Sequence, residues 1–163
     1  MILKTKRFIL KPLLENNATQ SYINWLIDFR NSGQGLKNNK IITITDLKNY
    51  IIEKNNSDIL FLGIFLRNKI LHIGNIKFEP LDYKKNQTTM GILIGDLEWR
   101  SKGVFNEIII DIEKYLVKIG IFKINLAVSK TNLHAIHVYK KNNFKVVKDE
   151  EKDIFMSKKI KVT

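Results

Sequence analysis

Residues 89–107 constrain the fold most, because they join a short apolar run, a polar turn and an amphipathic helix without interruption. The run at 90–94 carries no charge, which suits a strand that is buried on both faces. Apolar residues then recur at helical spacing between residues 104 and 119. The first turn of such a helix has free backbone N–H groups and the positive end of the helix dipole. This stretch therefore predicts an anion site, with phosphate or pyrophosphate as the bound group.

The same pattern also fits an ordinary loop with Arg100 and Lys102 exposed. Two other phosphate-binding loops are excluded, because the chain contains neither GxxxxGK[ST] nor a GxGxxG that follows a strand. Residues 100–105 remain as the candidate anion-binding segment.

The composition is that of an ordinary globular protein. A length of 163 residues suits one domain, 1–163, with a core of its own. No apolar run approaches the ~20 residues of a membrane helix, and the N-terminus lacks the long apolar region of a secretory signal. The absence of cysteine excludes disulfides, thiolate metal sites and a cysteine nucleophile. We therefore expect a cytoplasmic protein without a membrane partner.

The formal charge of +12 raises the question of a nucleic-acid partner. Lysine residues are spread over the whole chain, and no basic arm, RNA-binding signature or zinc finger accompanies them. The charge therefore indicates an attraction for phosphorylated small molecules, and we expect no nucleic-acid partner.

The pattern of apolar residues predicts an α/β (α+β) fold with one mixed sheet of six to seven strands and about four helices. Strands are expected at 5–14, 59–66, 70–79, 89–95, 122–128, 144–147 and 154–160. Helices are expected at 19–29, from a cap at Thr45-Asp46 to about residue 55, at 104–119 and at 132–141, with a long loop over 30–40. Gly74 indicates a bulge or a close approach of backbone. Gly120 and Asn142-Asn143 are expected to end helices.

Three separated segments form a further pattern. They are Thr5-x-Arg7-Phe8-x-Leu10-x-Pro12-Leu13, Gly91-Ile92-Leu93-Ile94-Gly95-Asp96 followed by Arg100-x-x-Gly103, and Asn132-x-x-Ala135-Ile136-x-x-Tyr139-x-Lys141-x-x-Phe144. In this order and spacing they resemble the GCN5-related N-acetyltransferase superfamily. The resemblance extends over essentially the whole chain. It is to the branch of ribosomal-protein N-terminal acetyltransferases and nucleotide-amino-sugar acetyltransferases.

The resemblance implies a V-shaped splay between the strands at 89–95 and 122–128, with acetyl-CoA as the cosubstrate held there. The implied cofactor-binding residues are Leu93, Ile94, Gly95, Arg100, Ser101, Lys102, Gly103, Val104, Phe105 and Asn132. Phe105 departs from the family motif, which usually has Gly or Ala at this position. Its side chain must turn into the core if only its N–H is to face the pyrophosphate. Asn143 replaces a usual Gly, and asparagine tolerates that backbone conformation.

The resemblance also implies two catalytic groups. The Ile94 N–H would stabilise the negative charge on the thioester oxygen, and the Tyr139 hydroxyl would protonate the departing thiolate. Without the motif, Tyr139 would be a core residue of an amphipathic helix and Asn132 a helix cap. The general base stays open among His72, Glu79, Asp82, Glu98 and a water molecule. His134 and His137 are three residues apart, but no third ligand accompanies them, and we expect no metal.

Three functions remain open for this protein. The first is a small amine, such as a nucleotide-linked amino sugar; the basic charge favours it, and Tyr22-x-x-Trp25-Leu26-x-Asp28 resembles the amino-sugar relatives. The second is the N-terminal amine of a ribosomal or other protein. The third is a non-catalytic acetyl-CoA-binding module in which Phe105 weakens the cofactor site. A homodimer through the last strands is compatible with the resemblance.

Overall fold

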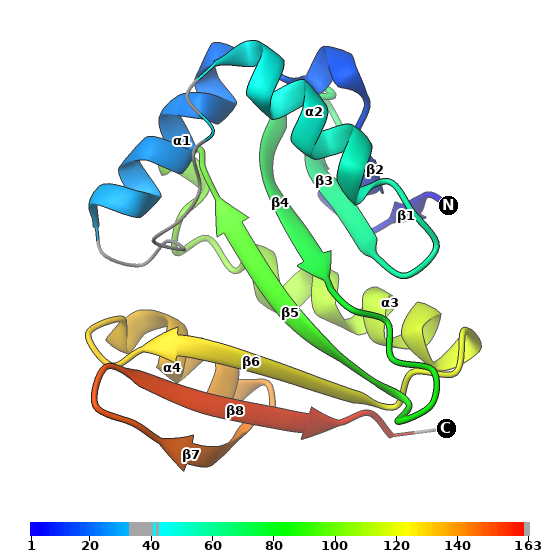
Figure 1. Cartoon of the computed structure of the whole chain (residues 1–163), viewed down its shortest axis with the longest axis vertical. Coiled ribbons are helices and arrows are strands. Elements are labelled where there is room, and N and C mark those ends of the chain that lie inside the picture. The colour runs from blue at the N-terminus through cyan, green and yellow to red at the C-terminus, as the bar shows by residue number, and fades with distance from the viewer. Residues whose placement is uncertain (33–40, 42, 162–163) are drawn as a thin grey trace.

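One mixed sheet of eight strands forms the centre of the computed structural model, in the order β1-β2-β3-β4-β5-β6-β8-β7 (Figure 1). The structure describes residues 1–32, 41 and 43–161. In these residues the strands are β1 Leu3–Lys4, β2 Phe8–Pro12, β3 Leu60–Leu66, β4 His72–Phe78, β5 Gln87–Ile94, β6 Lys123–Ser129, β7 Lys145–Asp149 and β8 Asp153–Lys159. The helices are α1 Gln20–Asn31, α2 Ile44–Lys54, α3 Val104–Lys118 and α4 Leu133–Lys141, with short 3₁₀ turns η1 Glu15–Asn17 and η2 Leu97–Trp99.

Helices cover both faces of the sheet, and α1 and α2 lie opposite α3 (Figure 1). The strand β3 shows why this arrangement forms. Leu62 and Ile64 pack in the core cluster that contains α3, whereas Phe65 packs with α1 and α2. A strand between two helical layers needs apolar residues on both sides, which explains the uninterrupted apolar run at 60–66.

The strand predicted at 5–14 corresponds to β2, and the two-residue β1 before it pairs with β2 in a small hairpin. The N–H of Thr5 donates to the Phe8 carbonyl at 2.9 Å, and this turn separates β1 from β2. The two-residue β1 is too short to show a period-two pattern, so the sheet has one strand more than the six to seven predicted. Most of the predicted loop, residues 33–40, lies outside the described residues, and α1 extends to Asn31.

The predicted cap of α2 was wrong by two residues. Thr43 caps the helix, because its hydroxyl accepts the Asp46 N–H at 3.1 Å while the Asp46 carboxylate accepts the Thr43 N–H at 3.0 Å. This reciprocal pair requires a spacing of three residues, which places Thr45 inside the first turn. Two helix ends agree with the sequence, since Gly120 (φ 84°) and Asn143 (φ 68°) both adopt the left-handed conformation after a helix.

The strands β5 and β6 pair only where they begin. Their parallel register runs from Gln87↔Lys123 to Thr89↔Asn125. Beyond Thr89, β5 continues beside β4 and β6 continues beside β8. The two strands therefore diverge (Figure 1), which confirms the V-shaped splay predicted at 89–95 and 122–128.

A bulge at Ile73 of β4 fixes the end of β5. The register between β3 and β4 shifts here, and the Ile73 carbonyl accepts the N–H groups of both Gly95 (3.0 Å) and Asp96 (3.1 Å). The next residue, Gly74, lies so close to β5 that a Cβ atom would stand 2.2 Å from the Leu93 carbonyl oxygen. The bulge and close approach predicted at Gly74 are confirmed.

This close approach predicts that Gly74→Ala separates β4 from β5 and lowers the free energy of unfolding by about 2 kcal/mol or more. Gly91→Ala on β5 is the matched control, because a Cβ there meets nothing within 4 Å. We expect the control to change stability by about 0.5 kcal/mol or less. Urea unfolding of both variants tests this, and equal losses in the two would contradict it.

Candidate active site

Every second residue of β5 points its backbone N–H and C=O groups into the gap between β5 and β6. The Thr89 carbonyl accepts the N–H of Glu79, the residue after β4, at 2.9 Å, and the Gly95 N–H donates to the Ile73 carbonyl of β4 at 3.0 Å. Because antiparallel pairs alternate, the odd-numbered residues between them also face β4. Ile92 and Ile94 therefore point their N–H and C=O groups away from β4, toward the gap beside β6. Of the three predicted β5 residues, only Ile94 does so; Leu93 and Gly95 bond to β4.

The helix α3 begins at the open end of β5, directly after a left-handed glycine. Gly103 is the N-cap residue with φ 72°, a conformation that a side chain disfavours. The first intrahelical bond runs from Glu107 N–H to the Gly103 carbonyl at 3.2 Å. The N–H groups of Val104, Phe105 and Asn106 thus have no partner within the helix. Such N–H groups, together with the helix dipole, suit an anion of the kind that the sequence predicts here.

The turn before α3 is tied to its neighbours on both sides. The Arg100 guanidinium donates to the Ile94 carbonyl at 3.0 Å and to the Gly95 carbonyl at 3.4 Å. These two hydrogen bonds join the end of the turn back to the end of β5. Ser101 adopts φ 58°, and its hydroxyl lies 3.5 Å from Nε2 of His134 on α4. The turn thus lies between β5 and the start of α4.

A single carboxylate fixes the start of α3 to the first hairpin. Glu107 accepts the Thr5 hydroxyl at 2.6 Å, the Arg7 backbone N–H at 2.7 Å and the Arg7 Nε at 2.6 Å. The same guanidinium donates from Nη1 to the Lys102 carbonyl at 3.0 Å. Arg7 therefore joins the first hairpin to the Lys102 carbonyl, just before Gly103, and to the Glu107 side chain in the first turn of α3.

Phe105 turns its side chain into the core. It is 7% exposed, and its ring meets Tyr139 of α4 edge to face at 5.4 Å and lies 6.4 Å from Phe144. Its N–H remains at the open start of the helix. A large residue at this position therefore leaves the backbone accessible, and it also packs α3 against α4.

Tyr139 is half-buried against the same aromatic residues. Burial raises the pKa of its hydroxyl to about 12. The group therefore keeps its proton at neutral pH and can donate it. Asn132, seven residues earlier, caps α4 by accepting the Ala135 N–H at 3.2 Å. The capping role expected for Asn132 is thus present.

His72 is a packed histidine rather than a free base. Its ring stacks on Phe65 at 4.9 Å and makes edge contacts with Tyr22 and Trp25. Burial lowers the pKa of His72, and hydrogen bonds to Asn75 and the Gly74 carbonyl oppose this only in part. A neutral Nε2–H donates to the Gly74 carbonyl at 3.0 Å. His72 therefore supports the bulge of β4.

The three carboxylates proposed as bases are dispersed. Glu79 is paired with Lys54 at 2.7 Å and Lys77 at 2.8 Å, at the far end of β4 from the bulge. Partial burial alone would raise the pKa of Glu79, but hydrogen bonds and charge from the two lysines lower it. Asp82 accepts the Lys85 N–H in a turn, and Glu98 is exposed beyond β5. The structure does not bring these groups together.

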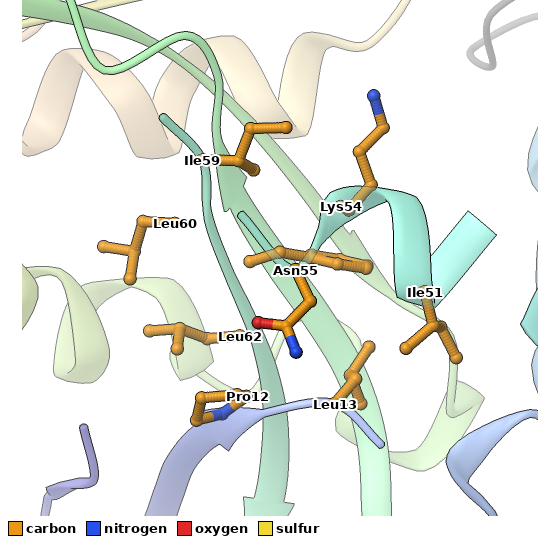
Figure 2. Close-up of a pocket in the computed structure, with 9 residues that line it drawn as sticks. Pro12, Leu13, Ile51, Lys54, Asn55, Ile59, Leu60 and Leu62 are labelled. Carbon is orange, nitrogen blue, oxygen red and sulfur yellow. The ribbon is translucent and has the colours of Figure 1, made fainter. Parts of the chain in front are cut away.

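A small pocket lies away from this site, between the ends of β2 and α2 and the start of β3 (Figure 2). Its volume of about 60 Å³ is far below the ~300 Å³ of a small-molecule site. In the described part of the chain, no group of three His, Cys, Asp or Glu side chains could hold a metal ion. None of the described helices is long and apolar enough to cross a membrane.

The sequence has a relative among characterised enzymes, although no family model matches the chain. It is 30% identical over 113 residues to the spermidine N(1)-acetyltransferase of Thermoplasma acidophilum. The match covers 69% of this chain and 67% of the relative. The chain belongs to the GCN5-related N-acetyltransferase family.

Solved structures share the whole fold. The PaiA N-acetyltransferase of Thermoplasma acidophilum in complex with coenzyme A has a TM-score of 0.72 at 23% identity, covering 93% of this chain and 98% of that one. The microcin C7 self-immunity acetyltransferase MccE, in complex with acetyl-CoA and AMP, has a TM-score of 0.79 at 14% identity, covering 95% and 93%. Ribosomal-protein acetyltransferases are further neighbours.

The family is therefore the one that the three segments resemble. The chain is an N-acetyltransferase enzyme with acetyl-CoA as its cosubstrate. The residues present fit that molecule, since the backbone N–H groups at the start of α3 suit a pyrophosphate and the free edge of β5 suits an extended amide-containing arm.

Sequence reasoning missed Glu107 and the partners of Arg7. The motif at the first strand contains Thr5 and Arg7, and Glu107 opens α3, but about 100 residues separate them. The only available signal was a carboxylate in the first turn of a helix, which the dipole alone explains.

The carboxylate of Glu107 gives a pH-dependent prediction. Partial burial would raise its pKa, yet bonds from Thr5 and Arg7 lower it below 4.5. Its stabilisation is therefore complete above about pH 4.5 and is lost as the pH falls through the lowered pKa. Glu107→Gln should lose about 1–2 kcal/mol of stability at pH 7, with a difference that shrinks as the pH falls through the lowered pKa. A loss that does not depend on pH in urea unfolding would contradict this.

Proposed function

We propose that this enzyme transfers the acetyl group of acetyl-CoA directly to the primary amine of a small, nucleotide-linked amino sugar. The observation that carries the proposal is the free edge of β5, where the Ile94 N–H faces the gap a few residues before the open start of α3. One element thus presents a donor for a developing oxyanion and leads to a site for phosphates.

The predicted residues other than Leu93 and Gly95 take roles that their geometry supports. Acetyl-CoA supplies a thioester as the acyl donor. Backbone N–H groups of Val104 and Phe105 bind the pyrophosphate at the start of α3, with Gly103 permitting the turn. The Ile94 N–H stabilises the charge that develops on the carbonyl oxygen.

Tyr139 acts as general acid toward the departing sulfur, and a water molecule takes the proton that the attacking amine loses. Its hydroxyl is protonated at neutral pH, and its ring lies against Phe105 at the start of α3. Arg100 shapes the turn through its guanidinium, Ser101 through its left-handed backbone and Lys102 through its carbonyl, which accepts from Arg7. Asn132 caps α4 and thereby fixes where the helix begins, which determines the position of Tyr139 two turns later.

The choice of acceptor rests on charge and on the face covered by α1. The chain carries a formal charge of +12, which attracts a phosphorylated acceptor and repels a polyamine. Trp25 of α1 packs over Gly95, where a Cβ atom would meet the indole at 1.9 Å. An aromatic wall at the end of β5 suits a planar or sugar ring. The MccE structure holds AMP as well as acetyl-CoA, so this fold has room for both molecules.

Two other acceptors compete with this proposal. The relative from Thermoplasma acidophilum is named for spermidine, which favours a small polyamine. The protein N-terminus is supported only by a shared fold with ribosomal-protein acetyltransferases. A homodimer through the last strands remains an expectation from the family resemblance.

Acetylation of an amino-sugar nucleotide, spermidine and an N-terminal peptide should be compared under identical conditions with a thiol-release assay. We expect the highest kcat/KM for the sugar nucleotide, with a value that falls as salt is added, because charge attracts this acceptor. A higher kcat/KM for spermidine would replace the proposed acceptor by a polyamine and leave the transferase mechanism intact.

The role of Tyr139 predicts that Tyr139→Phe binds acetyl-CoA within about twofold of wild type in calorimetry but loses about 10²-fold or more in kcat. Gly103→Asp should lose binding, because a carboxylate would face the pyrophosphate and strain the left-handed turn. Wild-type kcat in Tyr139→Phe would remove the hydroxyl from the mechanism. Unchanged affinity in Gly103→Asp would move the phosphate site elsewhere.

A further inference from the structure

A larger hollow, lined by basic side chains, lies beside the turn that leads into α3. It has a volume of about 480 Å³ and is lined by Lys6, Arg7, Leu66, Arg67, Asn68 and Trp99. This volume lies within the ~300–1,000 Å³ of small-molecule sites. Three of the six lining residues are cationic, and none is acidic.

The charge in this hollow is only partly compensated. Glu107 pairs with Arg7 at 2.6 Å. No carboxylate of the described residues lies within 4.0 Å of Lys6 or of Arg67. Like charges that line one hollow repel each other, and a bound anion relieves that repulsion.

Hydrogen bonds between the turn before β2 and the turn after β3 fix the shape of the hollow. The Arg67 N–H donates to the Arg7 carbonyl at 2.8 Å, and the Arg67 Nη1 donates to the Thr5 carbonyl at 3.0 Å. These bonds fix the direction of the guanidinium and leave its other N–H groups for a ligand. A guanidinium with a neighbouring ammonium group is well suited to a phosphate.

An aromatic wall completes the hollow. The Trp99 ring meets Phe8 edge to face at 5.4 Å, and the Arg7 guanidinium lies 5.8 Å from the Trp99 ring centre. The indole is therefore held firmly and remains half-buried. A phosphate group beside a flat apolar wall matches the chemistry of a nucleotide.

We propose that this hollow binds a nucleoside phosphate, through its phosphate on Lys6 and Arg67 and its base or ribose against Trp99. The nucleotide is separate from the coenzyme, which the gap between β5 and β6 and the start of α3 would hold. The site does not depend on which amine is acetylated. Arg7 connects it to the Lys102 carbonyl, so a ligand here contacts the same residue that holds the turn before α3.

Tryptophan fluorescence gives a local readout, because the chain has only Trp25 and Trp99. In a Trp25→Phe background, AMP and UMP should quench Trp99 saturably, with inorganic phosphate as a probe of the phosphate contact alone. Lys6→Ala and Arg67→Ala should each weaken nucleotide binding about tenfold, the loss expected for one charged hydrogen bond. Lys69→Ala is the matched control, since it removes the same charge from the same turn outside the hollow.

Titration in saturating acetyl-CoA distinguishes this nucleotide from the coenzyme. Nucleotide binding that persists supports the separate site, whereas binding that is lost assigns the hollow to the coenzyme and overturns the proposal. The proposal is overturned if no saturable quenching occurs, or if Lys69→Ala weakens binding as much as Lys6→Ala and Arg67→Ala do. Thermal unfolding of each variant shows whether it is folded.

Discussion

Beyond Thr89, β5 is hydrogen-bonded along one edge only, and the rest of the site depends on that half-paired strand. A fully paired strand would leave no backbone groups for a ligand, whereas an edge strand exposes alternate N–H and C=O groups. The bulge at Ile73 ends the pairing with β4, and the chain then turns into α3. The opening therefore leads from the Ile94 N–H to the unpaired N–H groups at the start of α3.

Two different interactions keep this arrangement rigid. The Glu107 carboxylate, Arg7 and the Lys102 carbonyl hold the turn from the side of the first hairpin. Phe105 holds it from within, because its ring packs against Tyr139 and thereby joins the start of α3 to α4. Preorganised dipoles need no reorientation when charge develops on the substrate, which is why a rigid frame favours catalysis.

The sequence predicted those elements that depend on a single residue or on a short run of neighbouring residues. Gly74 marked the bulge, Gly120 and Asn143 marked helix ends, and the uncharged run at 90–94 marked the strand beside the splay. It could not reveal Glu107 with Arg7, because that contact joins distant segments. Nor could it show that Leu93 and Gly95 face β4, since the direction of each amide follows from register rather than from residue type.

The most direct test of this account is the chemical shift of each backbone amide during titration with acetyl-CoA. The largest changes should occur at Val104, Phe105 and Asn106, with Ile94 as the principal change in β5 and a smaller effect at Leu93. This result would place the phosphates at the start of α3 and the thioester beside the free edge of β5. Large changes at Leu93 with none at Ile94, or none at residues 104–106, would contradict the account.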